Sequence, residues 1–234
     1  MECILCQKPM NLSYNGKYYF CLSCLLASSG QKFDSHVYDI DYTKNYIEYE
    51  HGDKAMMLMD IRTQWVKDFL PEGSTLIDYG CGTGLFLRCL KNNYICCGYD
   101  VNESVINYAK SKNMIHRYFN DPNTIPGIFE GITLFDVLEH FENPLEEMKK
   151  LNKLLLDRGL IFISTPNTEL NPIDSIPDDW RHFKPNEHLH YFTQYSLVRL
   201  AEKSGFKILK TDFRESEVRN TYENNIRCVT MVKL

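Results

Sequence analysis

Residues 76–84 read Leu76-Ile77-Asp78-Tyr79-Gly80-Cys81-Gly82-Thr83-Gly84, a short apolar run followed by an acidic residue and a turn with three glycines. A helical pattern begins directly after the turn, over residues 85–90. Glycine adopts positive φ at little steric cost, and its missing side chain lets a ligand approach the backbone. A strand, a glycine turn and a helix N-terminus in this order predict a ligand pocket in an α/β protein.

The next apolar run, residues 94–99, ends in Asp100. An acidic residue at this place, roughly 20 residues after the glycine turn, suits hydrogen bonds to ribose hydroxyl groups. Enzymes that use nicotinamide dinucleotides and enzymes that use S-adenosylmethionine (SAM) share this arrangement. Leu85 stands three positions after Gly82, where the dinucleotide motif has its third glycine. The turn therefore favours SAM over a nicotinamide cofactor.

Two later stretches complete a pattern with the glycine turn. They are Asp136-Val137-Leu138-Glu139-His140-Phe141-Glu142-Asn143-Pro144 and Ser164-Thr165-Pro166-Asn167. In combination, the three stretches resemble the class I SAM-dependent methyltransferases that act on small molecules, over about residues 74–215. The resemblance implies a transferase with a Rossmann-like fold. Arg158 stands where these proteins usually carry the first of two glycines.

The resemblance also implies how SAM is held. The three glycines of the turn would face its methionyl part, and Asp100 its ribose hydroxyls. Asp78 would orient the turn or reach the amino group of SAM; its alternative role is to cap the following helix. Asp121 is expected beside the adenine. The expected cofactor-binding residues are Asp78, Gly80, Cys81, Gly82, Gly84, Asp100, Val101, Asp121, Asp136, Tyr38 and Tyr42.

Tyr38 and Tyr42 belong to a tyrosine series that continues with Tyr46 and Tyr49. Spacings of four, four and three place the series along one face of a helix. The face either packs against the sheet or forms a lid over the pocket, as the segment before the glycine turn often does in proteins of this fold.

Four of the nine cysteines form a Cys-x2-Cys-x14-Cys-x2-Cys pattern of Cys3, Cys6, Cys21 and Cys24. This spacing is close to that of structural zinc sites, in which four thiolates leave no open coordination position. The remaining five cysteines are expected to be buried as small hydrophobic residues. An odd number of cysteines without a secretion signal indicates a reducing compartment. Residues 28–30 are expected to be a linker after the zinc module.

Composition limits the class of protein. Of the 234 residues, 44% are hydrophobic and 13% aromatic, which is enough for a buried core. The apolar runs are too short for a membrane span, and the first residues resemble no signal peptide. The formal charge of −5 argues against a nucleic-acid partner, since such binding needs a basic surface. We therefore expect a cytoplasmic protein that acts on a small molecule.

From residue 74 onward, strand and helix patterns alternate, which predicts a mostly parallel sheet with helices on both faces. The expected fold class is α/β: a Rossmann-like, doubly wound, seven-stranded sheet with a small N-terminal zinc-binding module. Expected strands are 75–79, 94–99, 115–119, 132–136, 160–164, 206–213 and 225–233. Expected domains are a zinc-ribbon-like module (1–30), a helical lid or linker (31–72) and the SAM-binding domain (73–234).

A methyltransferase needs a group that positions the acceptor and, for a hydroxyl or amine, takes up its proton. The candidate catalytic residues are His188, His190 and His140. Histidine suits this role because its ordinary pKa is about 6.5. His188 and His190 flank one residue, so in an extended chain they would point the same way and could also bind a metal ion. Alternatively, each histidine binds loop backbone.

The sequence predicts a SAM-dependent methyltransferase acting on an O or N atom of a small molecule, with sugar, polysaccharide or quinone-like biosynthesis as the context that the resemblance favours. One alternative is a C-methyltransferase of a nucleotide-linked sugar. A second is an inactive SAM-binding scaffold whose zinc module binds a macromolecule. A third is methylation of RNA or protein guided by that module.

Overall fold

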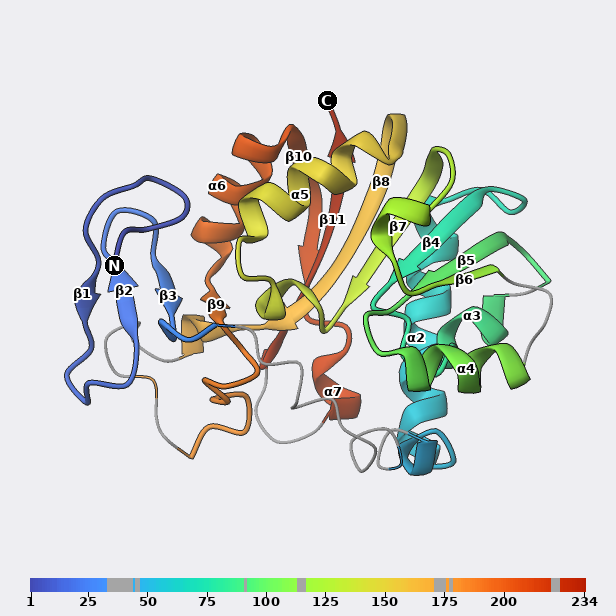
Figure 1. Cartoon of the computed structure of the whole chain (residues 1–234), viewed down its shortest axis with the longest axis horizontal. Helices are drawn as coiled ribbons and strands as arrows, with labels where there is room; N and C mark the ends of the chain where they lie inside the picture. Colours follow the sequence, from blue (N-terminus) through green and yellow to red (C-terminus); the bar gives the residue numbers. More distant parts are fainter. Residues whose placement is uncertain are drawn as a thin grey trace.

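The computed structural model describes residues 1–32, 44, 47–90, 92–112, 117–170, 176, 179–219 and 224–234. Its centre is a seven-stranded sheet in the order β10-β11-β8-β7-β4-β5-β6 (Figure 1). All neighbouring strands are parallel except those that pair with β11. The strands are β4 (Thr75–Tyr79), β5 (Ile95–Tyr99), β6 (Arg117–Phe119), β7 (Phe129–Phe135), β8 (Leu155–Pro166), β10 (Phe206–Asp212) and β11 (Ile226–Lys233). The predicted fold class and the order of its strands along the chain are confirmed.

Helices cover both faces of this sheet (Figure 1). Neighbouring residues on one strand, such as Leu76 and Ile77, belong to opposite core clusters because side chains alternate across a strand. One cluster includes residues of α5 (Pro144–Lys153) and α6 (Gln194–Ser204). The other includes residues of α2 (Asp53–Phe69), α3 (Leu85–Leu90) and α4 (Glu103–Lys112).

The residue types at the helix ends account for where α5 and α6 begin and where α6 ends. The Asn143 side chain accepts a hydrogen bond from the backbone N–H of Glu146 at 3.2 Å, and Pro144 opens α5. Thr193 caps α6, which ends at Gly205 with φ of +82°. Arg158, expected at a glycine position, has φ of +63°, so a side chain stands where glycine is the favoured residue.

A second sheet, of four strands, includes part of the segment 28–30 that was expected to be a linker. It comprises β1 (Asn11–Leu12), β2 (Tyr19–Cys21), β3 (Leu26–Ser28) and β9 (His190–Phe192), in that order. Residues 28–30 are no linker, because Ser28 lies in β3 and both Ser28 and Ser29 are buried. Since β9 lies far along the chain, the N-terminal module and the larger domain share this sheet (Figure 1).

The short remaining elements are η2 (Pro122–Thr124), η3 (Leu138–His140), η4 (Thr168–Leu170) and α7 (Ser216–Arg219). Among the described residues, no helix combines the length and the apolar character that a membrane crossing requires.

Candidate active site

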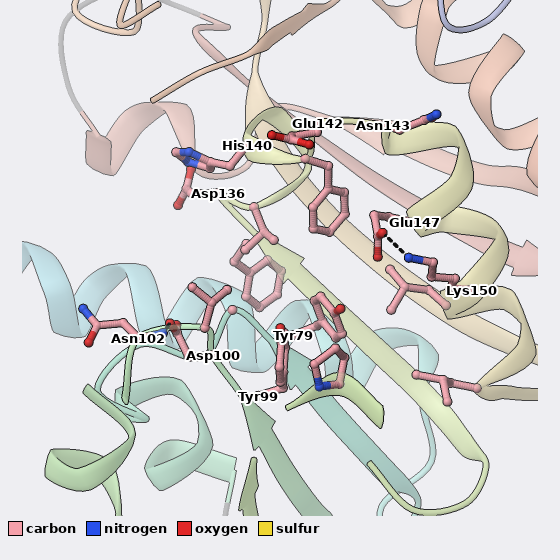
Figure 2. A pocket seen from close by; sticks show the side chains of 18 of the residues that line it. Tyr79, Tyr99, Asp100, Asn102, Asp136, His140, Glu142, Asn143, Glu147 and Lys150 are labelled. Atoms are coloured by element: carbon pink, nitrogen blue, oxygen red, sulfur yellow. Dashed lines mark hydrogen bonds and ion pairs between the residues drawn. The ribbon is translucent and has the colours of Figure 1, made fainter. Parts of the chain in front are cut away.

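Two cavities meet at the carboxyl ends of β4, β5 and β7, where the order of the strands reverses. The first, of about 790 Å³, is called here the strand-edge cavity and is lined by Tyr79, Tyr99, Asp100 and Asn102 among others (Figure 2). The second, of about 670 Å³, is called the histidine cavity. Gly80, Gly82, Phe135, Asp136 and His140 line both. Ligands of open α/β sheets bind at such a reversal of strand order.

The glycine turn between β4 and α3 has the backbone that its sequence predicts. Gly80, Gly82 and Gly84 all have positive φ, of +88°, +50° and +75°. A Cβ atom on Gly80 would lie 2.3 Å from a methyl group of Val137, so no side chain fits there. The turn is also fixed to the next strand, because the backbone N–H groups of Gly80 and Cys81 both donate to the carbonyl oxygen of Tyr99. The result is a fixed backbone cradle at the junction of the two cavities, both of which Gly80 and Gly82 line.

Asp100 joins this cradle to the end of β5. Its Oδ2 accepts a hydrogen bond from the backbone N–H of Gly82 at 2.8 Å, and its Oδ1 accepts one from Asn102 at 2.9 Å. Burial raises the pKa of Asp100, although these two bonds oppose the shift. Val101 follows as an exposed residue on the rim of the strand-edge cavity.

Asp78 and Cys81 line the histidine cavity. Asp78 is 4% exposed and accepts a hydrogen bond from the Thr133 hydroxyl at 2.6 Å. Burial raises the pKa of Asp78 to about 6, because the charged carboxylate loses its hydration.

Asp121 has a more peripheral place than expected. Its carboxylate caps η2 by accepting a hydrogen bond from the backbone N–H of Asn123 at 2.9 Å. Pro122 and Asn123 line the strand-edge cavity, but Asp121 itself lines neither cavity. Tyr38 and Tyr42 lie outside the described residues, while Tyr49 of the same series lines the histidine cavity.

Asp136 belongs to an ion-pair network that the sequence analysis missed. It has φ of +59° and lies between the guanidinium groups of Arg62 (2.8 Å) and Arg219 (2.9 Å). Burial alone would raise the pKa of Asp136, but the two arginines outweigh it and hold the pKa well below its usual range. Glu215 is fully buried and binds the same two arginines. The network forms one wall of the histidine cavity.

Glu139, His140 and His188 form a cluster in the histidine cavity, with their nearest ligand-type atoms all within 4.8 Å of one another. Glu139 is 1% exposed; its Oε2 accepts a hydrogen bond from Thr165, while its Oε1 has no partner among the described residues. Burial, together with the charge of Asp136, raises the pKa of Glu139 to about 8.

Both histidines of the cluster are oriented by backbone carbonyl groups. The Nδ1 atom of His140 lies 2.8 Å from the carbonyl oxygen of Glu187, and that of His188 lies 2.7 Å from the carbonyl oxygen of His182. Because a carbonyl only accepts, each Nδ1 carries the hydrogen and Nε2 is the basic atom of the neutral ring. Burial lowers the pKa of both rings, and that of His188 to about 3. Carboxylate and imidazole groups are also zinc ligands, so the cluster can hold a metal ion.

His190 has different surroundings from His188, although the two were expected to point the same way. Its Nδ1 lies 2.8 Å from the Ser28 hydroxyl and its Nε2 lies 3.3 Å from the carbonyl oxygen of Glu142. It lines neither cavity. The chain is not extended before β9, because the backbone N–H of His188 closes a turn on the carbonyl oxygen of Lys184. Both histidines thus contact backbone carbonyl groups, His188 that of His182 and His190 that of Glu142, as in the alternative interpretation.

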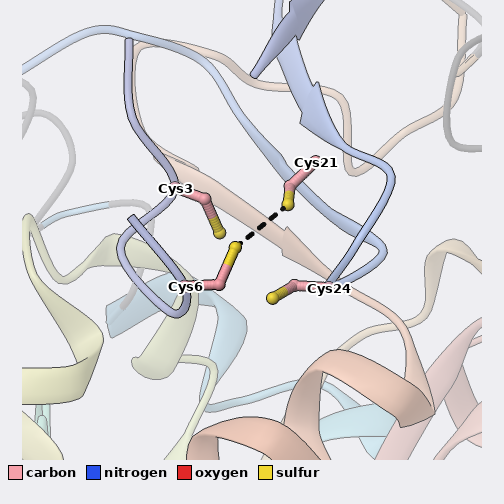
Figure 3. Close-up of side chains that lie close together, drawn as sticks. All are labelled: Cys3, Cys6, Cys21 and Cys24. Carbon is pink, nitrogen blue, oxygen red and sulfur yellow. Dashed lines mark hydrogen bonds between the residues drawn. The ribbon is translucent and has the colours of Figure 1, made fainter. Parts of the chain in front are cut away.

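The four N-terminal cysteines converge at one end of the small sheet (Figure 3). Their sulfur atoms lie within 4.8 Å of one another, and the pair Cys6–Cys21 is separated by 3.6 Å. Thiolates bound to zinc at about 2.3 Å in a tetrahedron lie about 3.8 Å apart. Each Cys-x2-Cys turn is followed by a residue with positive φ, Gln7 and Leu25, so the two halves repeat one local conformation. This donor set fits a structural zinc ion.

The family follows from the fold and the sequence together. The fold contributes the glycine cradle, the acidic residue at the end of β5 and the seven-stranded sheet. A sequence profile described as a methyltransferase domain matches residues 50–211, more than half of the chain. The chain belongs to the SAM-dependent methyltransferases.

Two curated relatives and one solved structure show the extent of the similarity. The chain is 32% identical over 130 residues to a mitochondrial ubiquinone biosynthesis O-methyltransferase of Dictyostelium discoideum, covering 45% of this chain and 39% of that one. It is 28% identical over 121 residues to a ubiquinone biosynthesis O-methyltransferase of Coxiella burnetii, covering 47% and 52%. The chain thus spans about half or less of the length of these relatives.

The magnesium protoporphyrin IX methyltransferase of Synechocystis, solved with bound SAH (S-adenosylhomocysteine), has the same fold with a TM-score of 0.65. The match covers 86% of this methyltransferase chain and all of the Synechocystis chain, at 15% sequence identity. Such low identity supports the fold alone.

Proposed function

We propose that this methyltransferase transfers a methyl group from SAM to an oxygen atom of a small molecule bound in the histidine cavity. The observation that carries the proposal is the position of the Glu139–His140–His188 cluster. It lines a cavity whose wall includes Gly80 and Gly82 of the glycine turn. Groups able to bind and deprotonate a hydroxyl thus face the same space as the expected cofactor cradle.

The residues at the strand ends fit SAM by their chemistry. The turn places the backbone of Gly80 and Gly82 on the walls of both cavities. We propose that Gly80, Gly82 and Gly84 with Cys81 surround the methionyl part, that Asp78 faces its ammonium group, and that Asp100 and Val101 face the ribose. When bound, SAM supplies a methyl group already activated by its sulfonium. The protein therefore has to align the acceptor and remove its proton.

His188 is the proposed base, with His140 beside it. Both rings are neutral at physiological pH, and each has its Nε2 free of a proton. The ring centroids lie 4.9 Å apart in an edge-to-face arrangement. A hydroxyl proton passed to Nε2 of His140 would place an imidazolium where the negative charge of Asp136 favours it. His190 is not part of this proposal, because both of its nitrogens already face protein atoms.

Oxygen is favoured as the acceptor atom because the curated relatives are named as O-methyltransferases. Quinone-like phenols and sugars remain the proposed acceptor classes. We further propose that the four cysteines hold zinc as a structural ion. The proposed domains remain a zinc-ribbon-like module (1–30), a helical lid or linker (31–72) and the SAM-binding domain (73–234), as a division by function and not by independent folding.

The test is release of S-adenosylhomocysteine (SAH) when the protein and SAM are incubated separately with catechols, nucleotide-sugars and primary amines, with and without added Mg²⁺ or Zn²⁺. Turnover with a hydroxylated compound supports the proposal, and dependence on added metal would assign the cluster a metal ion. Turnover with amines only, or methylation at a carbon atom, would contradict it. SAM binding without turnover on any acceptor would favour the inactive scaffold.

A further inference from the structure

We propose that the N-terminal ribbon (residues 1–29, with β1, β2 and β3) positions the histidine wall, the segment 179–189 that carries His182 and His188. The inference rests on the proposed function, because it takes the histidine cavity as the acceptor site. In this account the cysteine cluster acts on acceptor binding through a chain of contacts, while the cofactor side of the site does not depend on it.

The first link is the pairing of β3 with β9. Leu26 pairs with Phe192 and Ser28 with His190 in an antiparallel register. Strand β3 begins two residues after Cys24, and the hydroxyl group of Thr193 donates to the carbonyl oxygen of Leu25 at 2.9 Å. The end of the histidine wall is thus fixed to the strand that leaves the cysteine cluster.

The second link runs through the backbone of Leu189. Its carbonyl oxygen accepts a hydrogen bond from the N–H of Ser29 at 2.9 Å, and its own N–H donates to the carbonyl oxygen of Glu139 at 2.8 Å. One residue therefore connects the ribbon to the element that carries Glu139 and His140. His188 is the residue directly before it.

The third link is a small apolar cluster between the ribbon and the wall. Tyr18 and Ala27 of the ribbon are buried together with Ile176, Trp180 and Tyr191. The Tyr18 hydroxyl accepts a hydrogen bond from the backbone N–H of Ile176 at 2.6 Å, and its ring meets that of Phe183 edge to face. This cluster is separate from the two core clusters of the large sheet.

These links determine the orientation of His188. The His188 ring is held by the carbonyl oxygen of His182. The wall around these two residues consists of turns, in which Phe183 N–H donates to Trp180 and His188 N–H donates to Lys184. A turn without its own core keeps its shape only while the surface beneath it is ordered. The ribbon supplies part of that surface through Tyr18 and Ser29. A segment of this size has too little core of its own to fold stably without a metal ion or an equivalent cross-link.

The experiment compares the full-length wild-type protein with Tyr18→Phe and Tyr18→Ala. Three quantities are measured in each protein: hydrogen exchange of residues 180–192, the NMR signal of the Nδ1–H tautomer of His188, and SAM affinity by calorimetry. We expect exchange in the wall to rise about tenfold or more in Tyr18→Ala, with loss of the tautomer signal. Tyr18→Phe keeps the ring and should retain most of the His188 tautomer signal. SAM affinity and exchange in β4 and β7 should stay within about threefold of wild type.

Wall exchange and a His188 tautomer signal that remain at wild-type values in Tyr18→Ala would overturn the inference. A fall in SAM affinity in Tyr18→Ala by the same factor as the rise in wall exchange would also overturn it, since the ribbon would then support the whole fold. Removal of metal by a chelator should reproduce the Tyr18→Ala result. Failure of wild-type protein to bind SAM would instead contradict the proposed function and leave the wall measurement readable on its own.

Discussion

The carboxylate of Asp100 accepts a hydrogen bond from the backbone N–H of Gly82 at 2.8 Å, across the gap between β5 and the glycine turn. The bond fixes the acidic residue and the turn relative to each other before any ligand binds. Both residues also line the strand-edge cavity. A cofactor that contacts the turn with one end and Asp100 with its hydroxyls would meet a preorganised site.

Replacement of Asp100 by alanine should weaken SAM binding by about 1–3 kcal/mol, because hydrogen bonds to a charged group contribute in this range. Titration calorimetry measures the change. Asp157→Ala is the matched control, since its side chain is 99% exposed on β8 and should leave the affinity unchanged. Equal affinity in the two variants would remove Asp100 from the cofactor site.

An arginine at position 82 should abolish SAM binding while the protein stays folded. Gly73→Arg is its control: Gly73 also has positive φ, and a Cβ atom there meets nothing within 4 Å. Both variants carry the backbone strain of a side chain at positive φ, about 1–2 kcal/mol. Circular dichroism and calorimetry separate the two effects, and SAM binding by Gly82→Arg at wild-type strength would contradict the assignment of the pocket.

Stability should fall with rising pH because of Asp78. Its pKa in the folded protein is about 6, above the value of about 3.9 expected in the unfolded chain. Between these values the folded state holds more protons, so the free energy of unfolding decreases as pH rises and levels off above pH 6. Urea unfolding from pH 4 to 7 should show this contribution in wild type and lack it in Asp78→Asn. An identical pH profile for the two proteins would contradict the assigned burial.

His188→Gln should leave SAM affinity within about threefold of wild type but lower methyl transfer by about 10²–10⁴, the usual contribution of a general base. The rate of SAH release with an active acceptor measures it. His51→Gln, an exposed residue just before α2, serves as the control. Full activity in His188→Gln would transfer the role to His140.

Protein purified without a chelator should contain about one zinc ion per chain, as four thiolates complete one tetrahedral site. Cys6→Ser should lower the zinc content, whereas Cys89→Ser, a half-buried cysteine of α3, should not. Elemental analysis gives the answer. A wild-type protein free of zinc and of other metals would rule out the ribbon site.

Local signals explain how much of this arrangement the sequence predicts. The glycine turn, the Asn143 cap and the Gly205 stop act within a few residues, so their patterns are readable. The four cysteines likewise lie in one short segment.

Long-range relationships have no such pattern. Arg62 and Arg219 meet Asp136 only after the sheet has formed, and nothing near them in the chain marks the pairing. The pairing of β3 with β9 joins strands of three residues, too short for a recognisable alternation. The shared direction of His188 and His190 was mispredicted for a different reason, because a local turn onto Lys184 replaced the assumed extended chain.

The most direct measurement is titration calorimetry of the purified protein with SAM and, separately, with NADH. We predict SAM binding with a dissociation constant in the micromolar range and no binding of NADH. Binding of NADH, or the absence of SAM binding under conditions where the protein is folded, would contradict the assignment of the glycine turn and Asp100 to a SAM site.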